Sequence, residues 1–388
     1  MDISRFAEII SDKQFSNFKK MNYKYPNDFA DFIAILQDSY YEVLPLKDAQ
    51  GKPMVYLPIC TGIHLDAVKL LYTAQSAAYG TKALEEEIMA TSAIEQIDFS
   101  RDSVRNILKG LAPKTEEEDR IYALKKGFEF ISRKEHKITE ENLYSLYQMT
   151  IGNYLSKEDF LLPGQYYRHA PVYIMSNKVE HSGIPHEKLP DYMRDLITFA
   201  NTKDNLNDLL KAAVLHFYLS YVHPYFDGNG RMARLLHMWY LIQQGYESTL
   251  FVPLSGFIEK SRKKYYDAYT LTEDNRAYAG CLDLTPFLLY MIQNVYDELK
   301  TAPVEVDTLT QYRSILATGK ITQKEEKLWQ FVLSNYAKEP FTTKQLERDF
   351  GDAAYATIRS FVLKFTDLAL LEAQPRGNKV IYRVKTGG

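Results

Sequence analysis

Cysteine is scarce in this chain. Only Cys60 and Cys281 occur among 388 residues, which excludes a disulfide framework and is typical of proteins from reducing compartments. No run approaches the ~20 apolar residues of a spanning helix, and the first residues lack the basic and apolar segments of a secretory signal. The formal net charge of −3 gives no overall case for binding nucleic acid or membranes. We therefore expect a cytoplasmic protein without a membrane partner.

Helical periodicity accounts for most of the chain, and its length allows two or more domains. We expect a mainly α fold, with an N-terminal helical region over residues 1–60 and a larger helical domain over residues 61–300. Residues 301–320 are polar and less periodic, which indicates a linker. A separate C-terminal domain is expected at residues 321–388.

The stretch from residue 223 to residue 234 has the composition of an anion-binding loop between two helices. Periodic apolar residues predict one helix over 205–221 and another over 231–244. Gly228 and Gly230 would let the loop backbone approach a phosphate closely. The N–H groups at the start of the second helix attract negative charge.

Four charged or titratable side chains accompany these glycines. Arg231 and Arg234 are three residues apart, so both can face one bound anion. Asp227 can hold a hard cation such as Mg²⁺ through oxygen. His223 titrates near neutral pH and is suited to taking a proton from a hydroxyl. A base, a metal ligand and an anion site within twelve residues favour a catalytic site over a plain surface turn.

At this stretch the chain resembles the Fic family of nucleotidyltransferases. The family pattern H-P-F-x-[DE]-G-N-G-R-x-x-R matches from His223 onward, except that Tyr225 stands where the family prefers Phe. That residue anchors the loop in the core of the family's fold, so the added hydroxyl of Tyr225 needs a partner. The resemblance covers roughly residues 61–300 and implies a Fic-type helical core.

The resemblance also implies a role for each side chain of the loop. His223 would be the catalytic base, and Asp227 would hold Mg²⁺. Asn229 and Arg231, with the amides of the glycine loop, would bind the α- and β-phosphates of ATP. Arg234 would meet the γ-phosphate.

A predicted helix over residues 82–96 carries Thr91 and Glu95, which are four residues apart and share a face. The stretch is similar to the inhibitory helix of many Fic proteins, [ST]-x-x-x-E-[GN], and departs from it at Gln96. The resemblance implies that Glu95 pairs with Arg234 and occupies the γ-phosphate site.

Aromatic and β-branched residues dominate residues 166–174, and the proline within them favours an edge strand or hairpin. An edge strand has open backbone groups with which another chain can pair. The segment resembles the Fic flap, which holds the modifiable residue of the target. The implied docking residues are Pro171, Val172, Tyr173 and Ile174.

Tyr266 has two interpretations, and three histidines outside the loop are considered as core or metal-binding residues. On a predicted helix over residues 257–270, Tyr266 would contact adenine by resemblance to the family, and is otherwise an ordinary aromatic residue on a helix. His237 is interpreted as a core histidine. A metal site at His169 and His181 is disfavoured because no cysteines or carboxylate cluster lie nearby.

Residues 321–388 resemble a winged helix, with three predicted helices before two strands. A capping box at Thr342 begins the second helix. From Ala353 onward there are six Lys or Arg and two Asp or Glu residues, a mildly basic balance. Contacts with DNA phosphates are one candidate function and contacts with protein are the other. The residues that could touch DNA are Arg359, Lys364, Arg376 and Lys379.

The resemblance implies a protein adenylyltransferase that moves AMP from ATP to a Ser, Thr or Tyr hydroxyl of a target protein, the chain itself being one candidate. Removal of AMP, with Glu95 positioning a water, is an alternative, as is an enzyme with both activities. A DNA-binding regulator with a nucleotide-sensing Fic core is the alternative from another class. A metal hydrolase is disfavoured because its ligand set would be thin.

Overall fold

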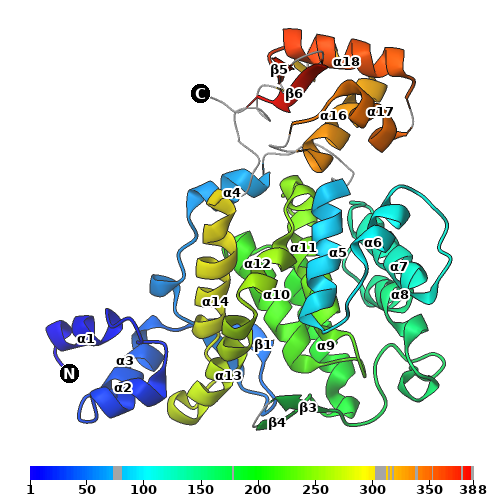
Figure 1. Ribbon diagram of the computed structural model, residues 1–388. Coiled ribbons are helices and arrows are strands. Elements are labelled where there is room, and N and C mark those ends of the chain that lie inside the picture. Colours follow the sequence, from blue (N-terminus) through cyan, green and yellow to red (C-terminus); the bar gives the residue numbers. More distant parts are fainter. Residues whose placement is uncertain are drawn as a thin grey trace.

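The computed structural model is mainly α-helical, as the periodicity predicts, and small two-stranded sheets are its other regular elements (Figure 1). Among the described residues, no helix is long and apolar enough to cross a membrane. The structure describes residues 1–72, 81–176, 179–301, 312, 315–316, 319–336, 340–351, 353–376 and 379–385.

A pair of buried helices lies at the centre of the main core. Nearly every side chain of α10 (Asp208–Val222) and α11 (Asn229–Gln243) is buried, so both are enclosed by other elements on all sides. This burial holds the loop between them rigidly. The other helices of this core are α4 (Leu65–Tyr72), α5 (Thr81–Ile94), α6 (Arg101–Leu108), α7 (Glu116–Ile131), α8 (Glu140–Thr150), α9 (Leu189–Asn201), α12 (Leu254–Lys260), α13 (Arg262–Ala279) and α14 (Thr285–Met291).

The observed helices begin and end within a few residues of most predicted bounds, with two main differences. The helical domain expected from residue 61 begins with α4 at Leu65, and residues 73–80 lie outside the described residues. The helix predicted over 257–270 is two helices, α12 and α13, separated at Ser261. The hydroxyl of Ser261 donates to the carbonyl of Phe257 at 2.8 Å, which closes the last turn of α12.

The N-terminal region is helical only over its first part. Helices α1 (Ile3–Ile10), α2 (Phe18–Lys24) and α3 (Phe29–Ile35) enclose a small apolar cluster of their own. The helical expectation for residues 1–60 is wrong beyond residue 41, where β1 (Glu42–Lys47) and β2 (Pro53–Tyr56) form an antiparallel hairpin. The inward side chains of this hairpin join the main core instead of the N-terminal cluster.

A second hairpin stands near one end of the helical core. Strands β3 (Tyr173–Ser176) and β4 (Val179–Ser182) pair in antiparallel register. The sequence correctly indicated a hairpin in this region but placed it too early. Residues 166–172 form no regular strand, and His181 and Ser182 belong to β4.

The C-terminal unit contains three helices followed by a hairpin, in the order that the sequence predicts. They are α16 (Gln323–Asn335), α17 (Thr343–Phe350), α18 (Tyr355–Asp367), β5 (Leu371–Arg376) and β6 (Lys379–Val384). The predicted capping box is present, because Thr342 and Gln345 exchange side-chain and backbone hydrogen bonds at the start of α17.

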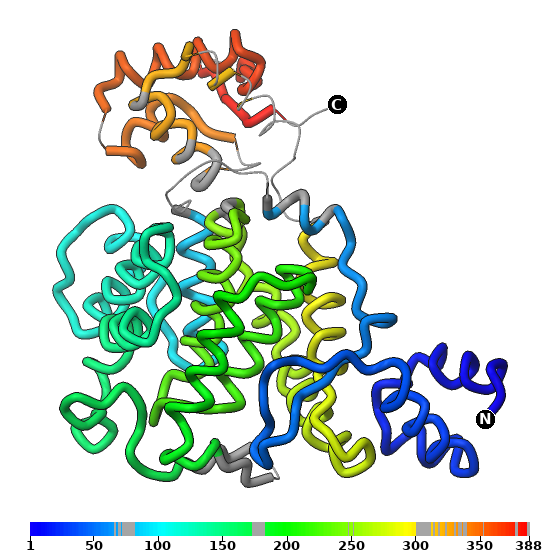
Figure 2. Tube along the Cα trace, turned by 180° about the vertical axis from the view of Figure 1, so that it is seen from behind, coloured from blue at the N-terminus to red at the C-terminus, as the bar shows by residue number. Residues whose placement is uncertain are grey.

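The C-terminal unit has its own apolar core, and Figures 1 and 2 show it next to one end of α5. In Figure 1 it lies away from the β3–β4 hairpin. Most of the expected linker, residues 302–311 and several after them, lies outside the described residues. The domain boundaries and the winged-helix assignment therefore stay predictions.

Phe361→Ala tests whether the two cores are separate. Phe361 is 1% exposed in the C-terminal core, so the substitution should destabilise this unit by about 3–5 kcal/mol. The two tryptophans serve as reporters, since Trp239 lies in the main core and Trp329 in the C-terminal core. In a Trp239→Phe background, where fluorescence reports Trp329 alone, Phe361→Ala should lower the urea concentration at which the C-terminal core unfolds. In a Trp329→Phe background, where fluorescence reports Trp239 alone, Phe361→Ala should leave the urea midpoint of the main core unchanged. A shift of both midpoints would contradict separate cores.

Candidate functional site

The loop between α10 and α11 begins at His223, which has a left-handed backbone with φ 55°. Pro224 disfavours the right-handed helical conformation at the residue before it, which favours an end of the helix here. The N–H of His223 still donates to the carbonyl of Leu219 at 3.0 Å, and its Nδ1 lies 3.2 Å from the carbonyl oxygen of Ser220. A carbonyl oxygen only accepts, so this contact requires a proton on Nδ1, and in the neutral ring Nε2 then has the lone pair.

Two interactions hold the middle of the loop against the core. Tyr225 is fully buried, as expected of an anchor, and its ring stacks on Tyr147 with centroids 3.7 Å apart. The amide of Asn229 accepts from the N–H of Tyr225 at 3.0 Å and donates to its carbonyl at 2.9 Å. The expectation that the Tyr225 hydroxyl has a partner is wrong for the described part of the chain. A phosphate contact from Asn229 would use the side-chain N–H that does not bind the carbonyl of Tyr225.

The two glycines of the loop stand where a side chain would collide. Gly228 has φ 81°, and a Cβ there would lie 2.6 Å from the side chain of Ile151. A Cβ at Gly230 would strike Oε1 of Glu95 and lie 3.4 Å from Nη1 of Arg234. Gly230 is therefore the point at which the loop, α5 and Arg234 meet.

Arg234 is buried and held by the end of α5. Its Nε donates to Oγ1 of Thr91 at 2.8 Å, and its Nη2 donates to the carbonyl of Thr91 at 3.0 Å and to Oε1 of Glu95 at 2.7 Å. The predicted pairing of Glu95 with Arg234 is thus present in the structure. Burial favours the neutral form of Glu95, but Arg234, with Arg231 and Arg262, outweighs it and holds the pKa of this carboxyl below its usual value.

The end of α5 is held by α13 as well. Nη1 of Arg262 donates to the carbonyl of Ala93 at 3.1 Å, and the hydroxyl of Tyr266 donates to the carbonyl of Ile94 at 3.3 Å. These carbonyls belong to the last turn, where a helix leaves them without partners of its own. Gln96 follows with φ 61°, a conformation that Gly or Asn adopts more readily. The hydroxyl of Tyr266, predicted to contact adenine, therefore binds α5 here.

Asp227 and Arg231 form the open side of the loop. The exposed carboxylate of Asp227 accepts from the N–H of Gly228 at 2.5 Å and binds Nη2 of Arg231 at 3.1 Å. Nε of Arg231 and Nη1 of Arg234 are buried donors without an acceptor in the described part of the chain. Since unpaired buried donors are costly, the pair favours an anion at this position.

The chemistry of Asp227 fits a bound Mg²⁺. Within the residues that the structure describes, no group of three or more His, Cys, Asp or Glu side chains could hold a metal ion. Mg²⁺ is commonly bound by one or two carboxylates, with phosphate oxygens and water as its other ligands. A single exposed carboxylate next to an anion site meets that requirement.

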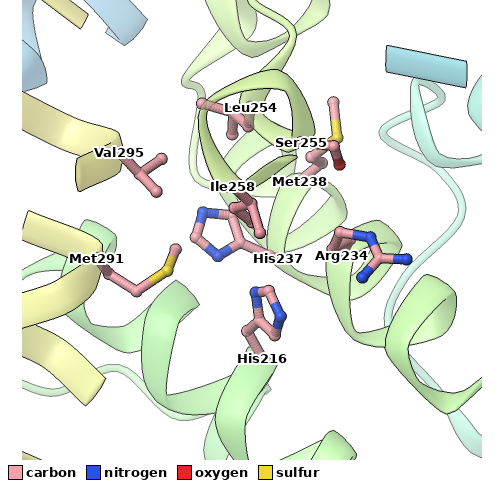
Figure 3. Close-up of a pocket in the computed structure, with 9 residues that line it drawn as sticks. All are labelled: His216, Arg234, His237, Met238, Leu254, Ser255, Ile258, Met291 and Val295. Carbon is pink, nitrogen blue, oxygen red and sulfur yellow. The ribbon is translucent and has the colours of Figure 1, made fainter. Parts of the chain in front are cut away.

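A small pocket behind Arg234 contains two buried histidines, whose imidazole rings point into it (Figure 3). Nε2 of His216 lies 2.9 Å from the hydroxyl of Tyr265, and Nε2 of His237 lies 3.2 Å from that of Tyr296. Burial lowers the pKa of His237 to about 3 and that of His216 well below its usual value. Both are therefore neutral, and His237 is a core histidine, as expected.

Arg168 received no role from the sequence, yet it links the loop to the β3–β4 hairpin. The side chain is buried, and its guanidinium donates to the carbonyl oxygens of His223, Ala170 and Ile184. No periodicity or motif marks this residue, because its partners are backbone carbonyl groups, and two of them lie 16 and 55 residues away in the sequence. Of the predicted docking residues, Pro171 is exposed and Val172 half-buried. Tyr173 and Ile174 lie in β3, and their side chains are outside the described ones.

One of the four basic residues suggested for DNA contact is already bound within the protein. Nζ of Lys364 lies 2.8 Å from both carboxylate oxygens of Glu325. Arg359, Arg376 and Lys379 are exposed. In this conformation Lys364 supports the fold of the C-terminal unit instead of a nucleic-acid surface.

Comparison with known proteins gives a family for the central part of the chain. Residues 137–241 match the model of the Fic/DOC family. The matched range contains the loop from His223 to Arg234, Arg168 and the β3–β4 hairpin, whereas Thr91 and Glu95 lie outside it.

Individual relatives are similar to parts of the chain. The protein adenylyltransferase fic-1 of Caenorhabditis briggsae is 23% identical over 209 residues, which are 50% of this chain and 36% of that protein. The protein adenylyltransferase Fic of Drosophila sechellia is 32% identical over 141 residues, which are 36% of this chain and 26% of that protein. The chain thus matches about a third or less of the length of these relatives. The solved structure of residues 134–508 of Caenorhabditis elegans Fic-1 is 18% identical, with a TM-score of 0.49 over 82% of this chain and 86% of that one.

Proposed function

Because this chain belongs to the Fic family, we propose that it transfers AMP from ATP to a side-chain hydroxyl of a protein and that Glu95 inhibits the transfer. The relatives named protein adenylyltransferase support this reaction. The observation that carries the proposal is the pair of buried donors, Nε of Arg231 and Nη1 of Arg234, beside the glycines at the start of α11.

The triphosphate would lie along this start of α11. Gly228 and Gly230 give the chain no side chain that would block it, and the first N–H groups of the helix face the negative charge. Arg231 would bind the phosphates nearer the reacting centre, and Arg234 would bind the γ-phosphate. Asp227 would hold one Mg²⁺, which when bound neutralises charge on the phosphate oxygens.

His223 would act on the acceptor instead of the nucleotide. Its Nε2 takes the proton of the target hydroxyl, whose oxygen attacks the α-phosphorus. The bond between that phosphorus and the bridging oxygen breaks, and pyrophosphate leaves. The Nδ1 contact with Ser220 keeps the ring in the tautomer that this step needs.

Inhibition would follow from competition for Arg234. A guanidinium that already binds Glu95 at 2.7 Å has fewer donors for a γ-phosphate, and the carboxylate repels that phosphate. ATP could still bind, but with its α-phosphate displaced from the line of attack. The hydrogen bonds that Arg262 and Tyr266 donate to the last carbonyls of α5 help keep Glu95 in place.

Loss of the base tests the proposed reaction. In a Glu95→Gly background, His223→Asn should lower labelling of protein from α-labelled ATP by about 10²–10⁴. Asparagine is the matched substitution because it tolerates the left-handed backbone of His223 and cannot act as a base at neutral pH. ATP binding, measured by calorimetry, should stay nearly unchanged. Labelling equal to that of the parent would contradict a role for His223.

Loss of the carboxylate tests the inhibition. Glu95→Gly should raise AMP transfer by about 10², because an unhindered Arg234 can seat the γ-phosphate and return the α-phosphate to the line of attack. Arg234→Ala in that background should lower transfer again. Glu86→Gly is the control, since Glu86 lies on α5, which directly precedes Glu95, but pairs with Arg101. Equal labelling by wild type and Glu95→Gly would show that Glu95 does not inhibit.

A further inference from the structure

A single buried guanidinium joins the β3–β4 hairpin to the residue that carries the proposed base. Arg168 is 2% exposed, and its Nε donates to the carbonyl of His223 at 2.8 Å. Its Nη1 donates to the carbonyl of Ala170 at 2.7 Å, and its Nη2 donates to that of Ile184. Ala170 precedes the hairpin and Ile184 follows it, so one planar group connects both ends of the hairpin to the start of the loop.

Backbone contacts at the same place strengthen the connection. The N–H of Arg168 donates to the carbonyl of Pro224 at 2.9 Å. Gly183 lies so close that a Cβ there would come 2.8 Å from Nη2 of Arg168 and 3.1 Å from Cβ of His223. The hairpin therefore leaves and rejoins the core directly beside His223.

His223 itself has anchors that do not involve Arg168. Its N–H binds the carbonyl of Leu219, and its Nδ1 faces the carbonyl of Ser220, both on α10. Loss of Arg168 would thus leave the imidazole attached to α10 and release mainly the hairpin. Lysine could not replace it, because one ammonium group lacks the fork of planar donors that reaches three separate carbonyls.

We propose that Arg168 is a positioning residue that fixes the β3–β4 hairpin relative to His223, so that an acceptor hydroxyl held on the hairpin lies within reach of Nε2. The inference rests on the proposed AMP transfer and deepens it. The hydroxyl oxygen forms a bond to the α-phosphorus, the bond to the bridging oxygen breaks, pyrophosphate leaves, and the proton goes to His223. Water can replace the hydroxyl in the same step and yield free AMP, and water needs no hairpin.

The comparison of these two acceptors tests the role of Arg168. In a Glu95→Gly background, Arg168→Lys should lower AMP transfer to protein by about 10²-fold and leave pyrophosphate release to water within about threefold. Lys211→Met is the matched control, because Lys211 is another buried cation bonded to a backbone carbonyl, at the far end of α10. It should change neither rate. Thermal unfolding checks that each variant is folded.

Equal losses in both rates would overturn the proposal, because Arg168 would then act on His223 or on folding. Unchanged transfer to protein would overturn it as well. If the Glu95→Gly parent transfers no AMP to any acceptor, the proposed function itself fails. Amide hydrogen exchange then tests, independently of AMP transfer, whether Arg168 anchors the hairpin. Faster exchange over residues 170–184 in Arg168→Lys, with residues 208–222 unchanged, would support it, and equal exchange in both segments would refute it.

Discussion

The site depends on the ion pair between Arg234 and Glu95, which crosses from α11 to α5 over Gly230. Arg234 is buried and bound by Thr91 and Glu95, so the end of α5 lies where it excludes other anions. Breaking such a pair leaves a buried charge without a partner, which is strongly unfavourable unless another anion replaces it. A terminal phosphate is such an anion. The same contact thus stabilises this conformation, and under the proposed function the γ-phosphate would displace Glu95 from it.

Unfavourable backbone conformations flank this pair. His223 and Gln96 are non-glycine residues with left-handed φ values of 55° and 61°. Such residues persist only where the surrounding structure determines them, and they gather at functional sites. Pro224 and the carbonyl groups of α10 hold His223. Hydrogen bonds from α13 to the last carbonyls of α5 hold the turn that comes directly before Gln96. Two of the three such residues in the described part of the chain therefore lie at positions that matter for the proposed reaction, and the third, Ala369, lies in the C-terminal unit.

The sequence was informative where chemistry is local. Helix geometry alone indicated that Thr91 and Glu95 share a face and that Arg231 and Arg234 can meet one anion. The resemblance to the Fic family implied the pairing of Glu95 with Arg234. It was uninformative for Arg168, because its three partners are backbone carbonyls, which carry no side-chain signature. The hairpin was placed too early because the aromatic run that suggested a strand is the segment that Arg168 holds against the core.

Nucleotide preference measures the competition for Arg234 most directly, because ATP and ADP differ only in the γ-phosphate. Calorimetric titration of both nucleotides into His223→Asn protein, with either Glu95 or the Glu95→Gly substitution, avoids turnover. A charge-assisted hydrogen bond is worth about 1.5–3 kcal/mol, so the preference for ATP over ADP should rise about tenfold or more when Glu95 is removed. The same ratio of affinities with and without Glu95 would contradict the claim that this carboxylate occupies the place of the γ-phosphate.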